Sequence, residues 1–503
     1  MAPVSRIDIR RENIFDSTEA NRWYARVINR WHATTREFVV RRELLLHVGS
    51  PYDSALAAES ARNLRRLGFF RSVRIDTVPN ALGPEVRVTT KDRWTTKGSA
   101  GARLSGGQVI FNASLAETNL AGTGVSLGFR YRTEPDRHSA RLALTVPRLL
   151  RNSTDVRLQV DRLTDGDVTL GALSNPFRAL SDRWAWSAEG TSLDRRVLQW
   201  RNGRSDPSDS LLRSLDMGRA LLGYAWQAGP NGYLRSEATV VARREDFGAY
   251  LPNVRLPRSR FVAAGVAMEA SRSRFHVTQG LRNSGIDEDV NLSPTFRAGL
   301  WASPAAWGYE RSGLGAEFLL QGGTLVAGQR GFAFAQLVAT GRQAAGLDSG
   351  TARGSATLIM RPTPDHLIAL YAGGGLQHRP APGMEFDLGL STGPRAFPAH
   401  AFTGDRMYQG TAEYQWTATR DLFGWRIASL GIAAFVDRGG AWFTGSPDRS
   451  GTDVGAGLRL GSPRVPTTNG LLRIDLARRL KNDALPGRWV LAVGNGFPFE
   501  VPR

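Results

Sequence analysis

The sequence predicts a mainly β protein that contains an antiparallel β-barrel spanning a membrane, at residues 94–503, and a small α+β domain at residues 1–93. Two observations predict the barrel. From Trp94 onward, segments of about ten residues alternate apolar and polar side chains between Gly, Asn, Asp and Pro turns. The chain also has 503 residues, more than one soluble core normally supports. We count between about 16 and 22 such segments.

A soluble β-sandwich is the alternative, because its strands alternate in the same way. Along residues 125–132, Val, Leu, Phe and Tyr share one face, while Ser, Gly and two Arg share the other. Three features favour the membrane barrel: the number of such segments, the lack of a fully apolar strand in the sequence, and aromatic residues near strand ends. These aromatic residues are Tyr408, Tyr414, Trp416, Trp425 and Trp489.

The charge of the chain does not indicate a nucleic-acid-binding protein. The formal net charge is +19, but the chain has only three lysines, and its arginines are dispersed without a basic stripe or tail. There is no cysteine, and the seven histidines are scattered. We therefore expect no nucleic-acid partner, no metal and no cofactor. No segment has the roughly 20 apolar residues that a membrane-spanning helix needs.

Residues 1–93 predict the order strand, helix, helix, strand, strand. A strand at residues 7–9 precedes a helix at residues 23–31, a capping box at residues 34–37 is expected to begin another helix, and Asp53 or Ser54 caps the helix that Gly68 ends. A hairpin follows, with strands at residues 73–76 and 86–88. This order and the segment "RRELLLHVGSPYDSALAAESARNLRRLGFFRSVRI" at residues 41–75 resemble a POTRA domain, the periplasmic module of outer-membrane assembly proteins.

A second resemblance lies near the C-terminus. The segments Arg395-Ala396-Phe397-Pro398, Gly404-Asp405-Arg406, Glu413-Tyr414 and Phe435-Val436-Asp437-Arg438-Gly439-Gly440-Ala441-Trp442 resemble the BamA/TamA family of outer-membrane proteins. The resemblance implies a barrel of about 16 strands, the sixth extracellular loop of which folds into the lumen. It also implies that the loop arginine, Arg395, pairs with an acidic residue of the wall, Asp437. Gly393, Ala396, Gly404, Asp405 and Gly439 support the motif, and Phe397 belongs to the loop tip.

Strand alternation supports this pairing independently of the family. The even-numbered residues from Ala428 to Val436 are apolar, so Asp437 is expected to face the lumen. Glu413 is a second inward carboxylate by the same argument. Otherwise Arg395 is a solvated loop arginine, and an exposed pair with Asp437 contributes at most about 1 kcal/mol. The chain departs from the family in having Ala396 in place of the usual glycine and Pro394 in place of an apolar residue.

The last predicted strand, about Arg488 to Phe499, resembles the sorting signal of barrel proteins. Its matching residues are Gly494, Phe497 and Phe499, whereas Pro498 and the tail at residues 500–503 depart from the signal.

These resemblances imply an outer-membrane protein of a Gram-negative bacterium that inserts or translocates polypeptides, with residues 1–93 in the periplasm. The implied partners are unfolded outer-membrane or secreted polypeptides, the lipid bilayer, periplasmic chaperones and accessory lipoproteins. The alternative is a porin-like or ligand-binding channel, in which inward arginines such as Arg130, Arg132 and Arg157 select anions. We expect no enzyme, because the sequence has no zinc-protease or phosphate-loop motif. The first residues have no apolar signal core. Either the numbering is therefore that of a mature form, or the inference that the protein is exported is wrong.

Overall fold

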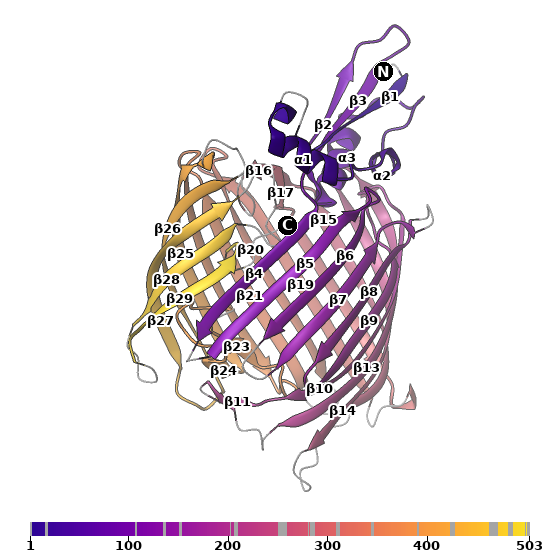
Figure 1. Ribbon diagram of the computed structural model, residues 1–503. Helices are drawn as coiled ribbons and strands as arrows, with labels where there is room; N and C mark the ends of the chain where they lie inside the picture. The colour runs from indigo at the N-terminus through magenta and orange to yellow at the C-terminus, as the bar shows by residue number, and fades with distance from the viewer. Residues whose placement is uncertain are drawn as a thin grey trace.

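The structure is a computed structural model (Figure 1). It describes residues 3–15, 19–105, 108–133, 137–149, 153–201, 203–205, 210–249, 259–279, 281, 287–307, 312–343, 347–389, 392–422, 428–461, 471–480, 486–497 and 499.

The N-terminal region is a small α+β unit. Its elements are β1 (Arg6–Glu12), the 3₁₀ turn η1 (Glu19–Asn21), α1 (Trp23–Trp31), α2 (Glu37–Arg41), α3 (Ser54–Arg66), β2 (Phe70–Val78) and β3 (Glu85–Asp92). The sheet order is β1-β3-β2, with β1 parallel and β2 antiparallel to β3. The core includes Val40, Leu64, Val86 and Val88, which are almost completely buried. The predicted hairpin is confirmed by the pairing of β2 with β3.

The predicted end signals of α3 are confirmed in this unit, whereas the predicted start signal of α2 is not. Asp53 caps α3 by accepting from the backbone N of Ala55 at 2.7 Å, and Gly68 ends the helix region with a φ of 77°. The predicted capping box at residues 34–37 is wrong, because α2 has no side-chain cap. Thr35 instead donates from its backbone N and its hydroxyl to Asp92 Oδ2, at 2.7 and 2.9 Å.

Asp92 should make the stability of the N-terminal unit depend on pH. Burial raises the pKa of its carboxyl to about 7, from an ordinary value of 3.8, although the hydrogen bonds from Thr35 lower it. The folded chain therefore binds a proton that the unfolded chain releases between these values, so the free energy of unfolding falls as pH rises through 7. Relative to Asp92→Asn, the natural protein should lose roughly 2 to 3 kcal/mol between pH 5 and 8.

Pulse proteolysis in urea measures this free energy on the full chain. The comparison with Asp92→Asn also cancels the contribution of nearby His32, whose own pKa is lowered by burial. Identical pH profiles for the two proteins would show that the Asp92 carboxylate stays ionised in the fold.

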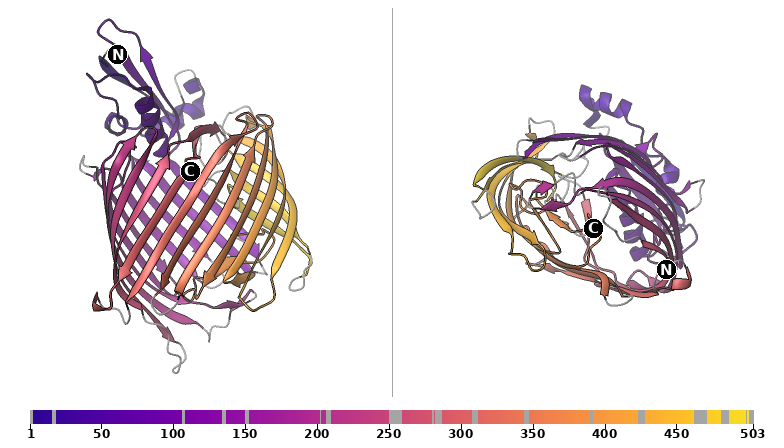
Figure 2. Two further views of the ribbon diagram at one scale, coloured as in Figure 1. Left: turned by 180° about the vertical axis from the view of Figure 1, so that it is seen from behind. Right: turned by 90° about the horizontal axis from the view of Figure 1, so that it is seen from below.

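Twenty of the strands that follow β3 form one large antiparallel sheet, which curves into a barrel-shaped wall (Figure 2). They are β4 (Thr96–Ser105), β5 (Gln108–Leu120), β6 (Val125–Thr133), β7 (His138–Val146), β8 (Asp155–Leu163), β9 (Gly166–Asn175), β10 (Trp184–Val197), β13 (Leu211–Gly229), β14 (Gly232–Ala249), β15 (Ser259–Arg272), β18 (Thr295–Ser303), β19 (Gly313–Val326), β20 (Gly331–Gln343), β21 (Leu347–Met360), β22 (His366–His378), β25 (Arg406–Thr419), β26 (Ser429–Trp442), β27 (Ser450–Gly461), β28 (Leu472–Arg479) and β29 (Arg488–Asn495). In the strand order β29 lies next to β4.

The number of strands differs from the expected value. About 16 strands, as the family resemblance implies, is wrong for this chain, whereas twenty lies within the range counted from the segments. The reason lies around residues 165–230, where β9, β10 and β13 pair in register within the main sheet. Among the described residues of this stretch, only the short pair β11 (Trp200–Arg201) and β12 (Arg204–Ser205) stands outside the main sheet.

The two faces of the sheet differ as the alternation predicts. Leu115, Leu142 and Leu476 expose 58%, 52% and 49% of their surface on the outer face. Trp489, one of the aromatic residues near strand ends, is also exposed, whereas Trp425 lies outside the described residues. Polar residues such as Asp437 and Asp475 alternate along the strands with outward-facing apolar residues, and they are buried on the inner face. No α-helix follows Asp92 in the described part of the chain, and no described helix is long and apolar enough to cross a membrane.

The N-terminal unit rests on one end of the sheet (Figure 1). The backbone N of Arg36 donates to the carbonyl of Gly122, in the turn between β5 and β6, at 2.9 Å. A hairpin of β16 (Phe275–Gln279) and β17 (Asp287–Asn291) lies at the same end. Arg65 of α3 holds it through two parallel hydrogen bonds to Asp289, at 2.7 and 2.8 Å. The unit and the sheet are therefore joined at more than one point.

The Arg65–Asp289 pair offers a test of this junction. Both side chains are mostly buried and the contact is bidentate, so we expect a coupling energy of about 1 kcal/mol in a double-mutant cycle of Arg65→Ala and Asp289→Ala. Pulse proteolysis in urea reports the stability of the N-terminal unit in each variant. Arg41→Ala is the matched control, because Arg41 makes an exposed pair with Glu37 in the same unit. Additive effects of the two junction variants would mean that the pair does not hold the unit.

Candidate functional site

The segment that connects β22 to β25, residues 379–405, lies inside the wall at the end away from the N-terminal unit (Figure 1). It carries the short antiparallel pair β23 (Phe386–Leu388) and β24 (Phe402–Gly404). Its apolar side chains form a buried cluster with Ala441 of β26; the cluster comprises Phe386, Leu388, Phe397, Ala401 and Phe402 as well. The loop is therefore packed against the wall over much of its length.

Arg395 of this loop is 2% exposed and lies among three carboxylates of the wall. It donates from Nη2 to Glu413 Oε2 at 2.7 Å and from Nη1 to Asp475 Oδ2 at 3.1 Å. Its Nε lies 2.8 Å from Asp437 Oδ2. The guanidinium carbon is 3.6 Å from the centre of the Phe435 ring, a cation–π contact. The structure thus brings together the predicted Arg395, Glu413 and Asp437, and adds Asp475.

A second layer of charges surrounds this contact. Arg459 donates to Glu413 Oε1 at 2.8 Å and to Asp475 Oδ1 at 2.6 Å, while Arg473 Nε lies 2.9 Å from Asp475 Oδ2. All members of the network are at most 5% exposed; they are Arg395, Arg459 and Arg473 with Glu413, Asp437, Asp453 and Asp475. Buried charges of this kind are stable only when each has partners, so the loop arginine is needed to balance the wall.

Ala396 is held by contacts of both its backbone and its side chain, although the family usually has glycine at this position. Its backbone N donates to Asp453 Oδ2 at 2.8 Å. Its side chain is 1% exposed and packs with Phe435, Ala477 and Val490. The methyl group therefore fills a small apolar niche beside the charge network.

Phe397 occupies a place that a glycine of β27 leaves open. A Cβ added to Gly451 would lie 2.0 Å from the Phe397 ring, so a side chain cannot be accommodated there without a shift. Gly439 leaves room for Pro394 in the same way, with the Cβ position 3.1 Å from the proline Cδ. Gly393, next to Pro394, has a φ of 91°, which favours glycine. The tip is thus shaped to its contacts on the wall.

Gly404 and Asp405 lie apart from the charge network. A Cβ on Gly404 would be 2.0 Å from the carbonyl carbon of Trp442, so this glycine allows β24 to approach β26. Asp405 accepts from the backbone N of Thr444 at 2.8 Å. Both residues position the base of the loop.

Sequence reasoning missed Asp453, Arg459, Arg473 and Asp475 as members of the site. The alternation that turned Asp437 inward also applies to them, because Val454, Ala456 and Leu458 are apolar on β27, and Leu472, Ile474 and Leu476 are apolar on β28. The signal was present in the sequence. Gly451 was also missed, since a glycine in a strand does not reveal which side chain approaches it.

The predicted sorting-signal residues do not all lie in the last strand. Gly494 is in β29, but the strand ends at Asn495, and Phe497 and Phe499 lie beyond it. Phe499 stacks on Tyr371 with 4.9 Å between ring centres. Both phenylalanines pack against the apolar cluster that includes Leu281, Val290 and Leu292, next to the β16–β17 hairpin. Pro498 and residues 500–503 are outside the described residues.

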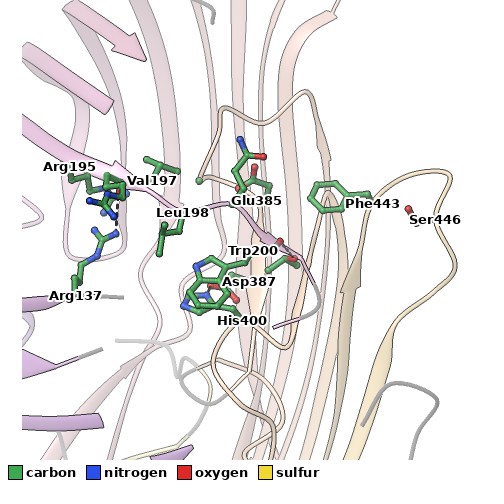
Figure 3. Close-up of a pocket in the computed structure, with 14 residues that line it drawn as sticks. Arg137, Arg195, Val197, Leu198, Trp200, Glu385, Asp387, His400, Phe443 and Ser446 are labelled. Carbon is green, nitrogen blue, oxygen red and sulfur yellow. Dashed lines mark hydrogen bonds and ion pairs between the residues drawn. The ribbon is translucent and has the colours of Figure 1, made fainter. Parts of the chain in front are cut away.

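A cavity of about 660 Å³ lies beside the loop (Figure 3). Trp200 stacks on His400 at 4.0 Å between ring centres, and His400 also contacts Asp387. Burial raises the pKa of the Glu385 carboxyl. The stack of Trp200 on His400 packs the loop that carries β11 and β12 against the base of residues 379–405.

Comparison of sequences supports the predicted resemblance. No family model matches the chain. The chain is similar to the outer membrane protein assembly factor BamA of Neisseria meningitidis serogroup B, with 32% identity over 129 residues. This match covers 24% of the present chain and only 16% of that protein.

Comparison of structures shows a similarity of fold over nearly the whole chain. CdiB from Escherichia coli aligns with a TM-score of 0.50 and 13% identity over 98% of this chain and 76% of that one. A structure of BamA from Haemophilus ducreyi lacking POTRA domains 1–3 aligns with a TM-score of 0.39 and 14% identity, over 98% and 84% of the two chains. The chain is therefore similar to BamA in sequence and to CdiB in fold, which confirms the predicted resemblance to BamA-like outer-membrane proteins.

Proposed function

We propose that the chain is an outer-membrane factor that inserts or translocates polypeptides. The large sheet is a closed barrel in the outer membrane of a Gram-negative bacterium, and residues 1–93 are a POTRA domain in the periplasm. The circular strand order and the exposed apolar outer face support this placement, because a bilayer tolerates a sheet only when its edges are paired. No covalent chemistry is required.

The observation that carries the proposal is the burial of Arg395 inside the wall. A loop arginine that balances Glu413, Asp437 and Asp475 acts as a latch, which holds residues 379–405 in the lumen. Arginine suits this role, because its planar fork bonds several carboxylate oxygens at once. Phe397 and Ala396 add apolar contacts on either side of the latch.

Substrate is received by backbone pairing. In the three-stranded N-terminal sheet β1 and β2 are the edge strands, and an extended polypeptide can add to such an edge. The seam between β4 and β29 is the place where the barrel opens toward the lipid for an incoming strand. Unfolded outer-membrane or secreted polypeptides are the substrates, and periplasmic chaperones or accessory lipoproteins deliver them.

The two segments that occupy the lumen agree less well with a passive porin than with the proposed function. Residues 379–405 enter from one end, and the β16–β17 hairpin packs inside the wall at the other, against Phe332, Ile359 and Leu367. A ligand-binding channel would have to move both segments. Planar bilayers should therefore show small, irregular conductance, whereas a large steady conductance would favour the porin.

Reconstitution tests the proposed activity. An unfolded outer-membrane barrel protein is added to lipid vesicles with or without the full chain, and its folded fraction is followed by heat-modifiable migration in gels. Folding should be faster with the full chain than with empty vesicles, and this effect should be lost in a chain lacking residues 1–93. Equal rates with empty vesicles would refute it.

A further inference from the structure

Helix α1 carries an exposed aromatic stripe that the proposed activity does not use. Trp23, Val27 and Trp31 are spaced four residues apart and expose 72%, 48% and 80% of their surface. Nine residues make up the helix, and its other face is occupied, since Ala25 is fully buried and Tyr24 and Ile28 pack with Ile14 and Phe15. Large exposed apolar side chains in one stripe mark an interaction surface.

The stripe is bordered by positive charge. Arg22, Arg26 and Arg30 are all exposed, and each precedes a stripe residue in the sequence. No acidic residue occurs in the helix. A short helix with tryptophan on one side and arginine beside it is typical of segments that lie in a bilayer interface, where the indole ring sits at headgroup level and the guanidinium meets phosphate.

The position of the helix connects it to the outer face of the sheet. Its apolar side packs with Trp94, two residues before β4 begins, so α1 lies beside the start of β4 (Figure 1). After the helix, Thr35 accepts a hydrogen bond from Asn119 Nδ2 of β5 at 2.8 Å. The next residue of that strand, Leu120, exposes 45% of its surface on the rim. The apolar outer face thus reaches the level at which α1 is held.

We propose that the surface formed by Trp23, Val27, Trp31, Arg22, Arg26 and Arg30 binds the anionic phospholipid headgroups of the membrane leaflet next to β4 and β5. This inference rests on the proposed membrane placement of the sheet. Bound to the leaflet, α1 anchors the N-terminal domain beside the seam of β4 and β29, and limits the directions in which the domain can swing.

A cysteine-free chain allows a site-specific test. Single cysteines at Val27, Leu82 or Leu115 are labelled with a fluorophore, and the full-length chain is reconstituted into phosphatidylcholine–phosphatidylglycerol vesicles that contain lipids brominated near the headgroup. Leu82 is the matched control, since it is 82% exposed in the turn between β2 and β3, at the far end of the domain. Leu115, exposed on β5, reports whether the sheet itself is in the bilayer.

The expected result is quenching at Leu115 and severalfold stronger quenching at Val27 than at Leu82. Omission of phosphatidylglycerol, or Arg26→Gln with Arg30→Gln, should reduce quenching at Val27 but not at Leu115. Quenching at Leu115 with no difference between Val27 and Leu82 would overturn this inference and leave the proposed function intact. Absence of quenching at Leu115 would overturn the membrane placement and the inference with it.

The stripe also has a competing occupant, an unfolded polypeptide. If such a polypeptide shields the Val27 label of the detergent-solubilised chain, and the bilayer does not, the surface is a substrate site and the lipid inference is wrong. Trp23→Ala with Trp31→Ala gives an independent reading, because it should weaken the quenching at Val27 while the folded fraction of the chain is unchanged.

Discussion

Arg395→Ala is expected to destabilise the large sheet by about 3 to 5 kcal/mol, because it leaves Glu413, Asp437 and Asp475 buried without one of their partners. The loss is expected in urea unfolding of the protein in lipid vesicles. Arg395→Lys should recover part of it, since an ammonium keeps the charge but not the planar fork. Arg162→Ala is the matched control, because Arg162 pairs with Asp167 at 2.6 Å on the surface and should change little.

The carboxylate partners should behave differently from the arginine. Asp437→Asn removes one of four acidic groups in a network with three guanidiniums, so the remaining charges balance better than after loss of Arg395. We expect a smaller effect of Asp437→Asn than of Arg395→Ala, and a double variant less unstable than the sum of the two. Full additivity would contradict the pairing of these residues.

Gly451→Ala is the second change expected to have a large effect. The added methyl would lie 2.0 Å from the Phe397 ring, so the loop tip has to move away from β27. Overpacking of this kind costs about 1 to 3 kcal/mol in the free energy of unfolding. Limited proteolysis of residues 379–405 in vesicles is expected to become faster, as the loop leaves its site.

The control for this change is Gly218→Ala on β13, where an added Cβ has no atom within 4 Å. Phe397→Leu combined with Gly451→Ala should restore part of the protection, because the smaller side chain leaves room for the methyl group. If Gly218→Ala and Gly451→Ala have the same effect, the glycine acts through the strand backbone and not through Phe397.

Much of the fold was predictable from period-two alternation. The inward direction of Asp437 and Glu413 follows from the apolar residues beside them, and the same rule would have found Asp475 and Arg459. The exact strand number was not predictable, because alternation does not distinguish a hairpin of the main sheet from one outside it. β9 and β10 belong to the main sheet, whereas β16 and β17 pair only with each other and pack inside the wall.

Tertiary contacts decided the remaining differences. The capping-box pattern at residues 34–37 failed because α2 begins only at Glu37, so that Arg36 takes the N-cap position. The preceding residue, Thr35, is held by Asp92, more than fifty residues away, which accepts from its backbone N and its hydroxyl. The C-terminal phenylalanines leave the strand because an apolar cluster inside the wall receives them. The sequence around these segments does not predict either partner, Asp92 or the apolar cluster. The complementarity of Gly451 and Phe397 is likewise visible only when β27 and the loop are seen together.

Three elements take part in the proposed function at different positions: residues 379–405, the β16–β17 hairpin and α1. Residues 379–405 pack inside the wall at the end away from the N-terminal unit, and the β16–β17 hairpin lies at the near end, tied to α3 through Arg65 and Asp289. A motion of the N-terminal domain would therefore act directly on the hairpin. Bound to the leaflet, α1 would restrict that motion to directions along the membrane.

Cross-linking of the loop to the wall tests the central claim, that Arg395 and its neighbours hold residues 379–405 inside the barrel. Ala396 and Ala477 pack in one cluster, and the chain has no cysteine of its own. Ala396→Cys with Ala477→Cys should become linked by mild oxidation or a short bifunctional thiol reagent in membranes, and Arg395→Ala should reduce the yield. Ala396→Cys with Leu476→Cys, on the outer face, should not link. Equal yields from the two pairs, or no link in either, would contradict the docked loop.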